Sequence, residues 1–279
     1  MLDGLIDDPV IARQTPRSDF TIDQCWSEYT RVEHEIWDFL YARQTQILQD
    51  RAAPEFLDGL KRLELSQSGI PDLERLNKAL NTLTGWTVVM VPHLVPDEVF
   101  FEHLANRRFP AGRFIRKRGQ LDYLEEPDIF HDIFGHVPML AHPVFADYMQ
   151  GYGQGGLRAA KLGFLKNLAR LYWHTVEFGL IKTDKGLRIY GAGIVSSFGE
   201  SQYALESQTP NRIGFDLLRL MRTEYEIDEF QKTYFAIDSF EQLFDATQQD
   251  FGPIYKELST SNFTYNSNEI LNRDALLSI

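Results

Sequence analysis

The chain has 279 residues, of which 43% are hydrophobic and 13% aromatic, a composition typical of a globular protein with a substantial core. Lys and Arg number 28 against 40 Asp and Glu, so the formal net charge is −12. An acidic surface repels phosphate backbones and anionic lipids, which argues against nucleic acids and membranes as partners.

The amino-terminal residues 1–20 are polar and contain prolines, and we expect them to form a loose arm ahead of a single domain at 21–279. The start of the chain lacks the basic residues and apolar stretch of a signal peptide. The most apolar segment, residues 85–95, is too short to span a bilayer. The single cysteine, Cys25, excludes an intrachain disulfide and a zinc site built from several thiolates. These features predict a cytoplasmic protein.

Apolar residues at helical spacing predict helices along much of the chain. The predicted helices cover residues 29–48, 72–83 with Asp72 as N-cap, 96–109 opening with Pro96 and Asp97, and 157–181 as one long helix.

Short strands are predicted over residues 85–95, 112–117 and 232–238, the last followed by a final helix capped by Asp238 or Ser239. Residues 187–205 are punctuated by Gly and Ser and indicate a strand or turn. Together these elements predict a mostly α-helical (α+β) single domain with a few short strands.

Gly151, Gly153 and Gly156 match the G-x-G-x-x-G pattern of dinucleotide-binding loops. That function needs a strand before the glycines, whereas residues 142–150 have a helical pattern. We therefore interpret the glycines as a flexible connector into the long helix.

His131 and His136 lie five residues apart in the stretch EPDIFHDIFGHVPML. On an α-helix, residues five apart are rotated by roughly 140°, so two such rings cannot reach one metal ion unless the chain bends. Asp128 can cap a short helix starting at Ile129, while Gly135 can end it and Pro138 stop its continuation. His136 would then swing toward His131. The alternative is one core histidine and one histidine that hydrogen-bonds at a helix end.

Glu177 is the candidate third ligand, because it lies within an apolar helical stretch where a carboxylate is rarely buried without a partner. Two His and one carboxylate form the ligand set of non-haem Fe(II) oxygenases. A zinc hydrolase can use the same three residue types, but it typically presents them in an H-E-x-x-H helix, which this chain lacks.

Three motifs resemble one family in order and spacing: DYLEEPDIFHDIFGHVPML, YWHTVEFGL and YGAGIVSSFGESQY. A weaker likeness runs upstream from IPDLERLNKALNTLTGW to RFIRKR. Over residues 20–260 the sequence resembles the pterin-dependent aromatic amino acid hydroxylases, the short bacterial phenylalanine hydroxylases in particular. The resemblance implies their catalytic fold and the conversion of L-phenylalanine to L-tyrosine with Fe(2+), O2 and a tetrahydropterin. Alternatives within the family are tryptophan hydroxylation at the 5-position and attack at the meta position of phenylalanine.

The resemblance also implies roles for single residues. It assigns the metal to His131, His136 and Glu177, which would be the catalytic centre. It assigns substrate binding to Arg116 for the carboxylate, Asp128 to orient that arginine, Ser196 as a further contact, and Pro127, Trp173 and Phe178 as walls of the aromatic pocket. It assigns pterin binding to Phe100, Tyr172 and Glu200.

The sequence departs from the animal enzymes of the family in two respects. Asp132 stands where those enzymes have glutamate, which leaves the placement of pterin or water open. The chain has no room for their regulatory domain and tetramer helix, so we expect a monomeric catalytic unit. His174 is interpreted as a residue of the helix surface.

Overall fold

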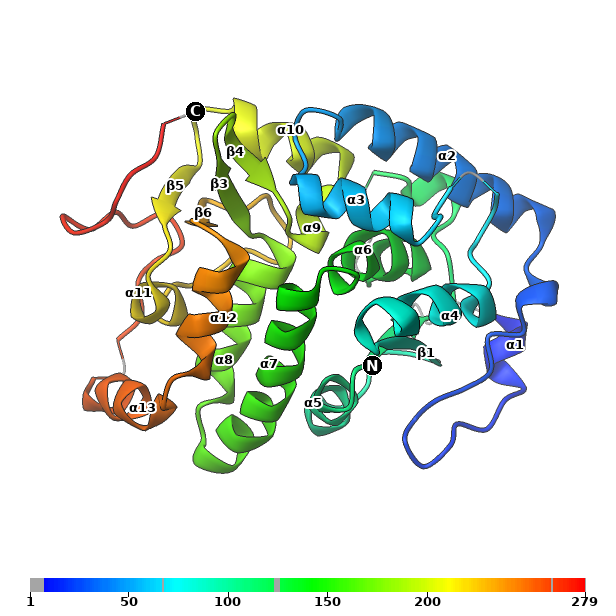
Figure 1. Ribbon diagram of the computed structural model, residues 1–279, viewed down its shortest axis with the longest axis horizontal. Coiled ribbons are helices and arrows are strands. Elements are labelled where there is room, and N and C mark those ends of the chain that lie inside the picture. The colour runs from blue at the N-terminus through cyan, green and yellow to red at the C-terminus, as the bar shows by residue number, and fades with distance from the viewer. Residues whose placement is uncertain (1–7, 67, 123–125, 262, 279) are drawn as a thin grey trace.

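The protein is described by a computed structural model that covers residues 8–66, 68–122, 126–261 and 263–278 (Figure 1). The α-helices are α1 (Pro9–Ala12), α2 (Arg31–Ile47), α3 (Pro54–Arg62), α4 (Leu73–Thr84), α5 (Asp97–Ala105), α6 (Val137–Leu140), α7 (Pro143–Leu162), α8 (Leu165–Tyr172), α9 (Ala192–Val195), α10 (Phe198–Glu206), α11 (Leu217–Met221), α12 (Phe240–Gln248) and α13 (Phe251–Thr260). Two π-helices, at Phe130–His136 and Trp173–Glu177, and 3₁₀ turns at Trp26–Glu28 and Arg118–Gln120 complete the helical structure of these residues.

Six short strands form two small sheets within the described part of the chain. The strands are β1 (Thr87–Val91), β2 (Arg108–Gly112), β3 (Leu180–Thr183), β4 (Gly186–Ile189), β5 (Asn211–Gly214) and β6 (Thr233–Ile237). Strands β1 and β2 pair in parallel, and the second sheet has the order β4-β3-β6-β5. In that sheet β3 and β4 are antiparallel, whereas β6 is parallel to both of its neighbours. The predicted mostly α-helical (α+β) fold is confirmed.

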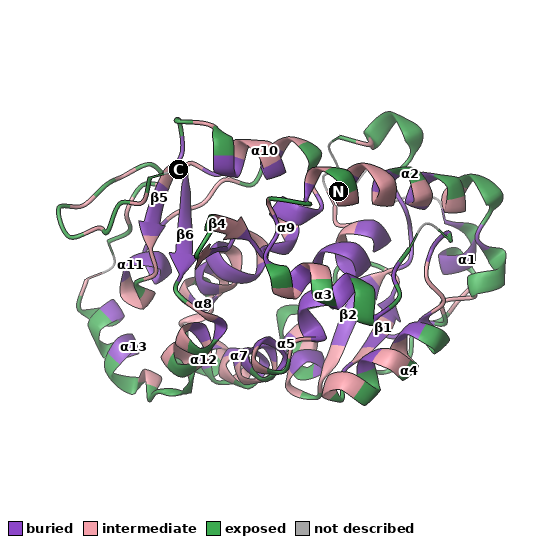
Figure 2. Ribbon diagram, turned by 45° about the horizontal axis from the view of Figure 1, so that its top comes forward, coloured by how far each residue is buried: buried purple, intermediate pink, exposed green. Residues whose placement is uncertain are grey.

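The core lies between the sheets and the helices that surround them. In Figure 2 the buried residues follow β5, β6 and the inward sides of the central helices, while exposed residues lie along the outer helices and loops. All five residues of β6 are buried. None of the helices among the described residues is long and apolar enough to cross a membrane.

The helices with clear start signals form where the sequence predicts them. Helix α2 begins with a capping box between Thr30 and Glu33, and α4 begins at Asp72, whose side chain accepts a hydrogen bond from the Glu74 N–H. Ser239 caps α12, but α13 follows it, so α12 is not the final helix.

The predicted long helix over 157–181 is wrong, because the chain forms two helices that meet at Gly163. Helix α7 begins 14 residues earlier, at Pro143, and ends where Gly163 adopts a left-handed conformation (φ 80°). Helix α8 and the second π-helix then continue to Glu177. The supposed connector of glycines therefore lies inside α7.

Two further boundaries differ from the predictions. The strand expected over 112–117 does not form there. Strand β2 lies earlier and ends at Gly112, where its pairing with β1 is complete. Residues 187–205, expected as a strand or turn, contain the end of β4, all of α9 and most of α10.

The amino-terminal segment is more ordered than the predicted loose arm. Val10 and Ile11 of α1 are buried, and the buried carboxylate of Asp8 pairs with Arg113. Residues 1–7 lie outside the described residues, and the division of the chain at residue 20 stays a prediction.

The glycines of α7 let this helix pack closely against α5. A Cβ atom at Gly153 would lie 2.4 Å from the Ala105 backbone nitrogen, and one at Gly156 would lie 2.0 Å from the Phe101 ring. Gly155, between them, has no atom within 4 Å of such a position. The G-x-G-x-x-G match is thus explained by helix packing.

Gly153→Ala should destabilise the fold, because the new methyl group meets backbone atoms of α5 that cannot move aside. Overpacking of this kind costs about 1–3 kcal/mol in the free energy of unfolding. Gly155→Ala is the matched control on the same helix, and its higher helix propensity should stabilise the protein by up to about 1 kcal/mol. Chemical denaturation of both variants measures the difference. Equal unfolding free energies would contradict the packing argument.

Candidate metal centre

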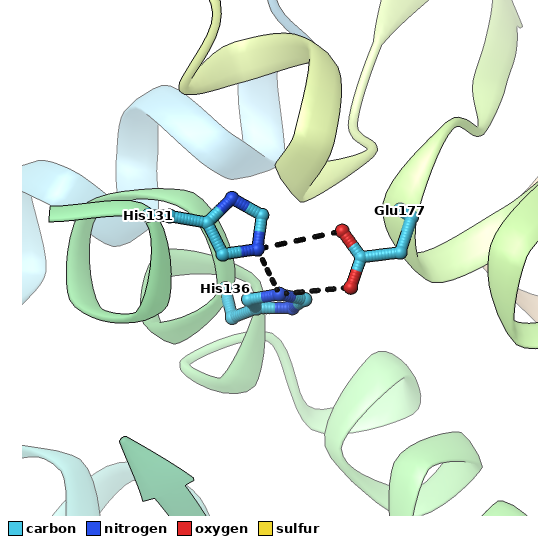
Figure 3. A group of neighbouring side chains, drawn as sticks. All are labelled: His131, His136 and Glu177. Atoms are coloured by element: carbon cyan, nitrogen blue, oxygen red, sulfur yellow. Dashed lines mark hydrogen bonds and ion pairs between the residues drawn. The ribbon is translucent and has the colours of Figure 1, made fainter. Parts of the chain in front are cut away.

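His131, His136 and Glu177 converge on one point (Figure 3). The two Nε2 atoms lie 3.1 Å apart, His131 Nε2 lies 3.5 Å from Glu177 Oε2, and His136 Nε2 lies 3.2 Å from Glu177 Oε1. These three residues are the one group of potential metal ligands of this size found among the described residues. The sequence prediction that they come together is therefore met by the geometry.

A π-helix explains how histidines five residues apart can face the same way. Residues Phe130–His136 form i→i+5 hydrogen bonds, and this wider turn brings the fifth residue back toward the face of the first. The helix does not end at Gly135, and Pro138 lies in the first turn of α6, where its missing N–H is tolerated. Gly135 instead allows close packing, since a Cβ there would lie 3.0 Å from the Ala192 carbonyl oxygen.

Glu177 ends the second π-helix. The Phe178 N–H donates to the Trp173 carbonyl oxygen at 2.9 Å, an i→i+5 bond. Gly191 and Gly193 bring the start of α9 against this turn, because Cβ atoms there would lie 2.4 Å and 3.1 Å from the Glu177 carbonyl oxygen. The glycines of the YGAG motif therefore shape the backbone behind the candidate ligand.

The tautomer of His131 follows from its hydrogen bonds. Ser196 donates its hydroxyl proton to the Ala192 carbonyl oxygen at 2.7 Å, so its oxygen can only accept from His131 Nδ1–H, at 2.9 Å. Nε2 of His131 is then unprotonated and faces the other two ligands. Burial lowers the pKa of His131 to about 4, against the opposing charge of Glu177. Burial raises the pKa of Glu177, but the two histidines outweigh this effect and lower it overall.

The donor set fits a metal ion. The unprotonated Nε2 of His131 and the carboxylate oxygen of Glu177, 3.5 Å apart, repel one another, and a cation between them removes the repulsion. The set contains no thiolate, and nitrogen with carboxylate suits Fe(II) as well as zinc. A neutral imidazole with a hydrogen-bonded Nδ1–H is also the usual form of a metal-binding histidine.

Asp128 is fully buried and joins Arg116 to the first π-helix. Its carboxylate accepts from Arg116 Nε and Nη2, both at 2.8 Å, and from the Arg116 and His131 backbone N–H groups. Burial opposes ionisation, but the hydrogen bonds and charge of Arg116 outweigh it and lower the pKa of Asp128. Asp128 also caps this helix, as predicted, and it occupies one edge of the guanidinium group.

Phe100 and Tyr172, assigned to the pterin, lie together. Their rings meet edge to face at 5.8 Å, and Tyr172 lies 6.2 Å from the His136 ring. Nearby, Asp132 accepts from the Gly112 N–H at 2.7 Å, and burial raises its pKa to about 7. The Glu200 carboxylate accepts from the Tyr234 hydroxyl and from the Gln231 backbone N–H. Its assignment to the pterin stays a prediction.

Trp173 and Phe178, assigned to the pocket wall, are in contact at 5.1 Å between ring centroids. Pro127 precedes Asp128 and is half-buried. The Ser196 hydroxyl oxygen lies 2.9 Å from His131 Nδ1, and its predicted contact with the substrate stays a prediction.

The prediction that His174 lies on the helix surface is wrong. Its side chain is buried, its Nε2 lies 3.1 Å from the Thr223 carbonyl oxygen, and burial lowers its pKa to about 4. Sequence reasoning also missed Tyr225, which stacks on Trp173, and Gln231, which accepts from the Trp173 indole. Both lie more than 50 residues from Trp173, and no local pattern marks either of them.

Known proteins resemble this chain over nearly its full length. The family profile described as biopterin-dependent aromatic amino acid hydroxylase matches residues 21–276. The phenylalanine-4-hydroxylase of Ralstonia nicotianae is 63% identical over 264 residues, covering 95% of this chain and 84% of that protein. The one of Caulobacter vibrioides is 65% identical over 244 residues, covering 88% and 83%.

Solved structures agree with this likeness. Phenylalanine hydroxylase from Chromobacterium violaceum bound to cobalt has a TM-score of 0.94 at 53% identity, covering 96% of this chain and 97% of that one. The same enzyme with iron and phenylalanine bound has a TM-score of 0.92 at 52% identity, covering 96% and 98%. As its motifs predicted, the chain belongs to the biopterin-dependent aromatic amino acid hydroxylases.

Proposed function

We propose that the protein is a phenylalanine 4-monooxygenase, which hydroxylates L-phenylalanine to L-tyrosine and consumes O2 and a tetrahydropterin. The observation that carries the proposal is the convergence of His131, His136 and Glu177, in a chain whose relatives are named phenylalanine-4-hydroxylase. Those names favour the para position of phenylalanine over the alternatives, tryptophan or the meta position. The relatives named above are hydroxylases, which favours this activity over that of a zinc hydrolase.

His131, His136 and Glu177 would hold one Fe(II) ion. When bound, iron with the pterin supplies the redox chemistry that activates dioxygen. The chain's contribution is to hold two imidazole rings and one carboxylate in a fixed arrangement. Ser196 fixes the His131 ring, and the π-helix fixes the spacing of both rings.

Arg116 would bind the carboxylate of the substrate. Asp128 uses the Nε–Nη2 edge of the guanidinium, and Nη1 donates one proton to the Leu121 carbonyl oxygen at 3.4 Å. One proton of Nη1 and the second proton of Nη2 are then left for a second carboxylate. Trp173, Phe178 and Pro127 would surround the substrate ring, and Phe100 with Tyr172 would hold the pterin. An aromatic wall of this kind excludes water from the reacting ring.

Several finer points stay predictions. These are the monomeric state, the absence of nucleic-acid and membrane partners, the cytoplasmic location and the assignment of Glu200 to the pterin.

The activity itself is tested by incubating the protein with Fe(II), a tetrahydropterin and each of phenylalanine, tyrosine and tryptophan, then identifying the products by mass and retention. Absence of pterin-dependent tyrosine from phenylalanine would refute the proposal.

Glu177→Gln should lose iron, because an amide oxygen lacks the charge of the carboxylate. We expect affinity for Fe(II) to fall at least tenfold, since even indirect partners of metal ligands are worth about 10- to 100-fold. Tyrosine formation should fall with it. Glu241→Gln, at an exposed position on α12, is the control. Metal analysis after anaerobic loading and desalting gives the stoichiometry, and one retained equivalent in Glu177→Gln would remove this residue from the site.

Arg116→Lys should lower kcat/KM for phenylalanine by about tenfold or more, because an ammonium cannot serve Asp128 and the substrate carboxylate together. Lysine is preferred to alanine because an unpaired buried Asp128 would cost about 3–5 kcal/mol. Phenethylamine, which lacks the carboxylate, should be affected little. Arg118→Lys, at an exposed position, is the matched control. An equal loss on both substrates, or loss of bound iron, would show that Arg116 supports the fold or the metal.

Phe100→Ala should raise the KM for tetrahydropterin, because the pterin loses a stacking partner worth about 0.5–1.5 kcal/mol. This corresponds to roughly a two- to tenfold change. The KM for phenylalanine should change less. Steady-state kinetics with each substrate varied in turn, beside the exposed-residue control Phe39→Ala, makes the comparison. Unchanged pterin kinetics would place Phe100 in ordinary packing.

A further inference from the structure

The indole of Trp173 contacts two aromatic rings. Tyr225 stacks on it with centroids 4.4 Å apart and an interplanar angle of 19°, and Phe178 lies at 5.1 Å. Trp173 begins the π-helix that ends with Glu177. Stacking restrains the plane of the indole but leaves it free to slide and turn within that plane, so a further contact is needed to fix its orientation.

That contact is a hydrogen bond from Trp173 Nε1–H to the side-chain oxygen of Gln231, at 3.2 Å. The chain has four tryptophans, and the other three, Trp26, Trp37 and Trp86, all donate their indole N–H to backbone carbonyl oxygens. Trp173 is thus the one tryptophan whose orientation depends on another side chain.

The carboxamide of Gln231 is itself fixed in the orientation that accepts this bond. Its oxygen also accepts from the Glu226 backbone N–H at 3.1 Å, and its nitrogen donates to the Glu226 carbonyl oxygen at 2.7 Å. A flipped amide would set its NH2 group against two N–H donors and its oxygen against a carbonyl. The buried side chain therefore presents an oxygen, and only an oxygen, to Trp173.

The backbone of Gln231 is anchored to α10. Its N–H donates to Glu200 Oε1 at 3.1 Å, and the same oxygen accepts from the Tyr234 hydroxyl at 2.7 Å. Glu200 is buried, in the first turn of α10. The chain of contacts thus runs from Glu200 through Gln231 to Trp173.

We propose that Gln231 is a positioning residue, held by Glu200, which orients the indole of Trp173 as a wall of the substrate pocket. The proposal rests on the function proposed above, because it takes Trp173 to face the substrate ring. Gln231 touches neither substrate nor metal and acts through Trp173 alone. Loss of the Gln231 side chain should therefore lower kcat/KM for phenylalanine more than it changes the KM for tetrahydropterin.

The first experiment observes the indole directly and needs no activity. In ¹⁵N-labelled protein the four tryptophans give four indole N–H signals, and the Trp173 signal is the one missing from the Trp173→Phe variant. Gln231→Met, of similar size but without an acceptor oxygen, should shift the Trp173 signal upfield and speed its exchange with solvent, while the other three signals stay in place. Gln202→Met, at a half-exposed position on α10, is the matched control and should shift none. An unchanged Trp173 signal in Gln231→Met would overturn the proposal.

The second experiment is a double-mutant cycle on kcat/KM for phenylalanine. Gln231→Met should lower this value by about five- to tenfold in the wild-type background, the size expected for one hydrogen bond. The KM for tetrahydropterin should stay within about twofold. In the Trp173→Phe background, where the donor is absent, Gln231→Met should cost less than about twofold. The same loss in both backgrounds would mean that Gln231 only supports the fold.

If Gln231→Met fails to fold, Gln231→Asn takes its place, because it keeps a carboxamide but withdraws the oxygen by one methylene. The same indole shift and the same cycle are expected. Wild-type protein that makes no tyrosine would refute the proposed function, whereas an unmoved indole signal in active protein would refute the role of Gln231. The two failures are therefore distinguishable.

Discussion

The candidate site depends on the carboxylate of Asp128. This side chain is fully buried, and a buried carboxylate is tolerated only when its oxygens are paired. Arg116 supplies two side-chain donors and one backbone donor, and His131 supplies a backbone N–H. One charge therefore holds both the arginine proposed for the substrate and the start of the helix that carries two proposed metal ligands. The spacing between those two functions is set before any ligand binds.

Both segments that carry the proposed metal ligands are π-helices, which are rare and occur mostly at functional sites. The wider turn has a different geometric effect in each segment. Between His131 and His136 it brings rings five residues apart to one side. Before Glu177 it lets the chain turn from α8 into β3 while the carboxylate still faces the histidines. The glycines at 135, 191 and 193 then allow α9 to approach both segments closely, which a side chain at these positions would prevent.

The sequence predicted that His131, His136 and Glu177 come together, because a carboxylate within an apolar helical stretch needs a partner and the two histidines stand close by in the chain. It also predicted the helices with strong caps, such as the one that begins at Asp72. It failed where tertiary contacts decide the outcome. Periodicity does not distinguish a π-turn from a helix end, so the pattern predicts a helix end at Gly135 that the structure lacks. The glycines of α7 resemble a flexible connector because the helix they admit, α5, lies some 50 residues earlier in the chain. A surface position is predicted for His174 because the Thr223 carbonyl that pairs with it is 49 residues away.

The junction of α9 and α10 carries two polar side chains that hold other residues of the candidate site in place. Ser196 and Glu200 both lie in the stretch GIVSSFGE, and the family resemblance implies a substrate contact for one and a pterin contact for the other. In the structure the Ser196 hydroxyl proton is used by the Ala192 carbonyl, so this oxygen orients His131. Glu200, four residues later, holds the backbone of Gln231 and, through it, Trp173. A single short segment thus positions a proposed metal ligand and a proposed pocket wall. Its two polar side chains hold those groups in place by hydrogen bonds within the protein.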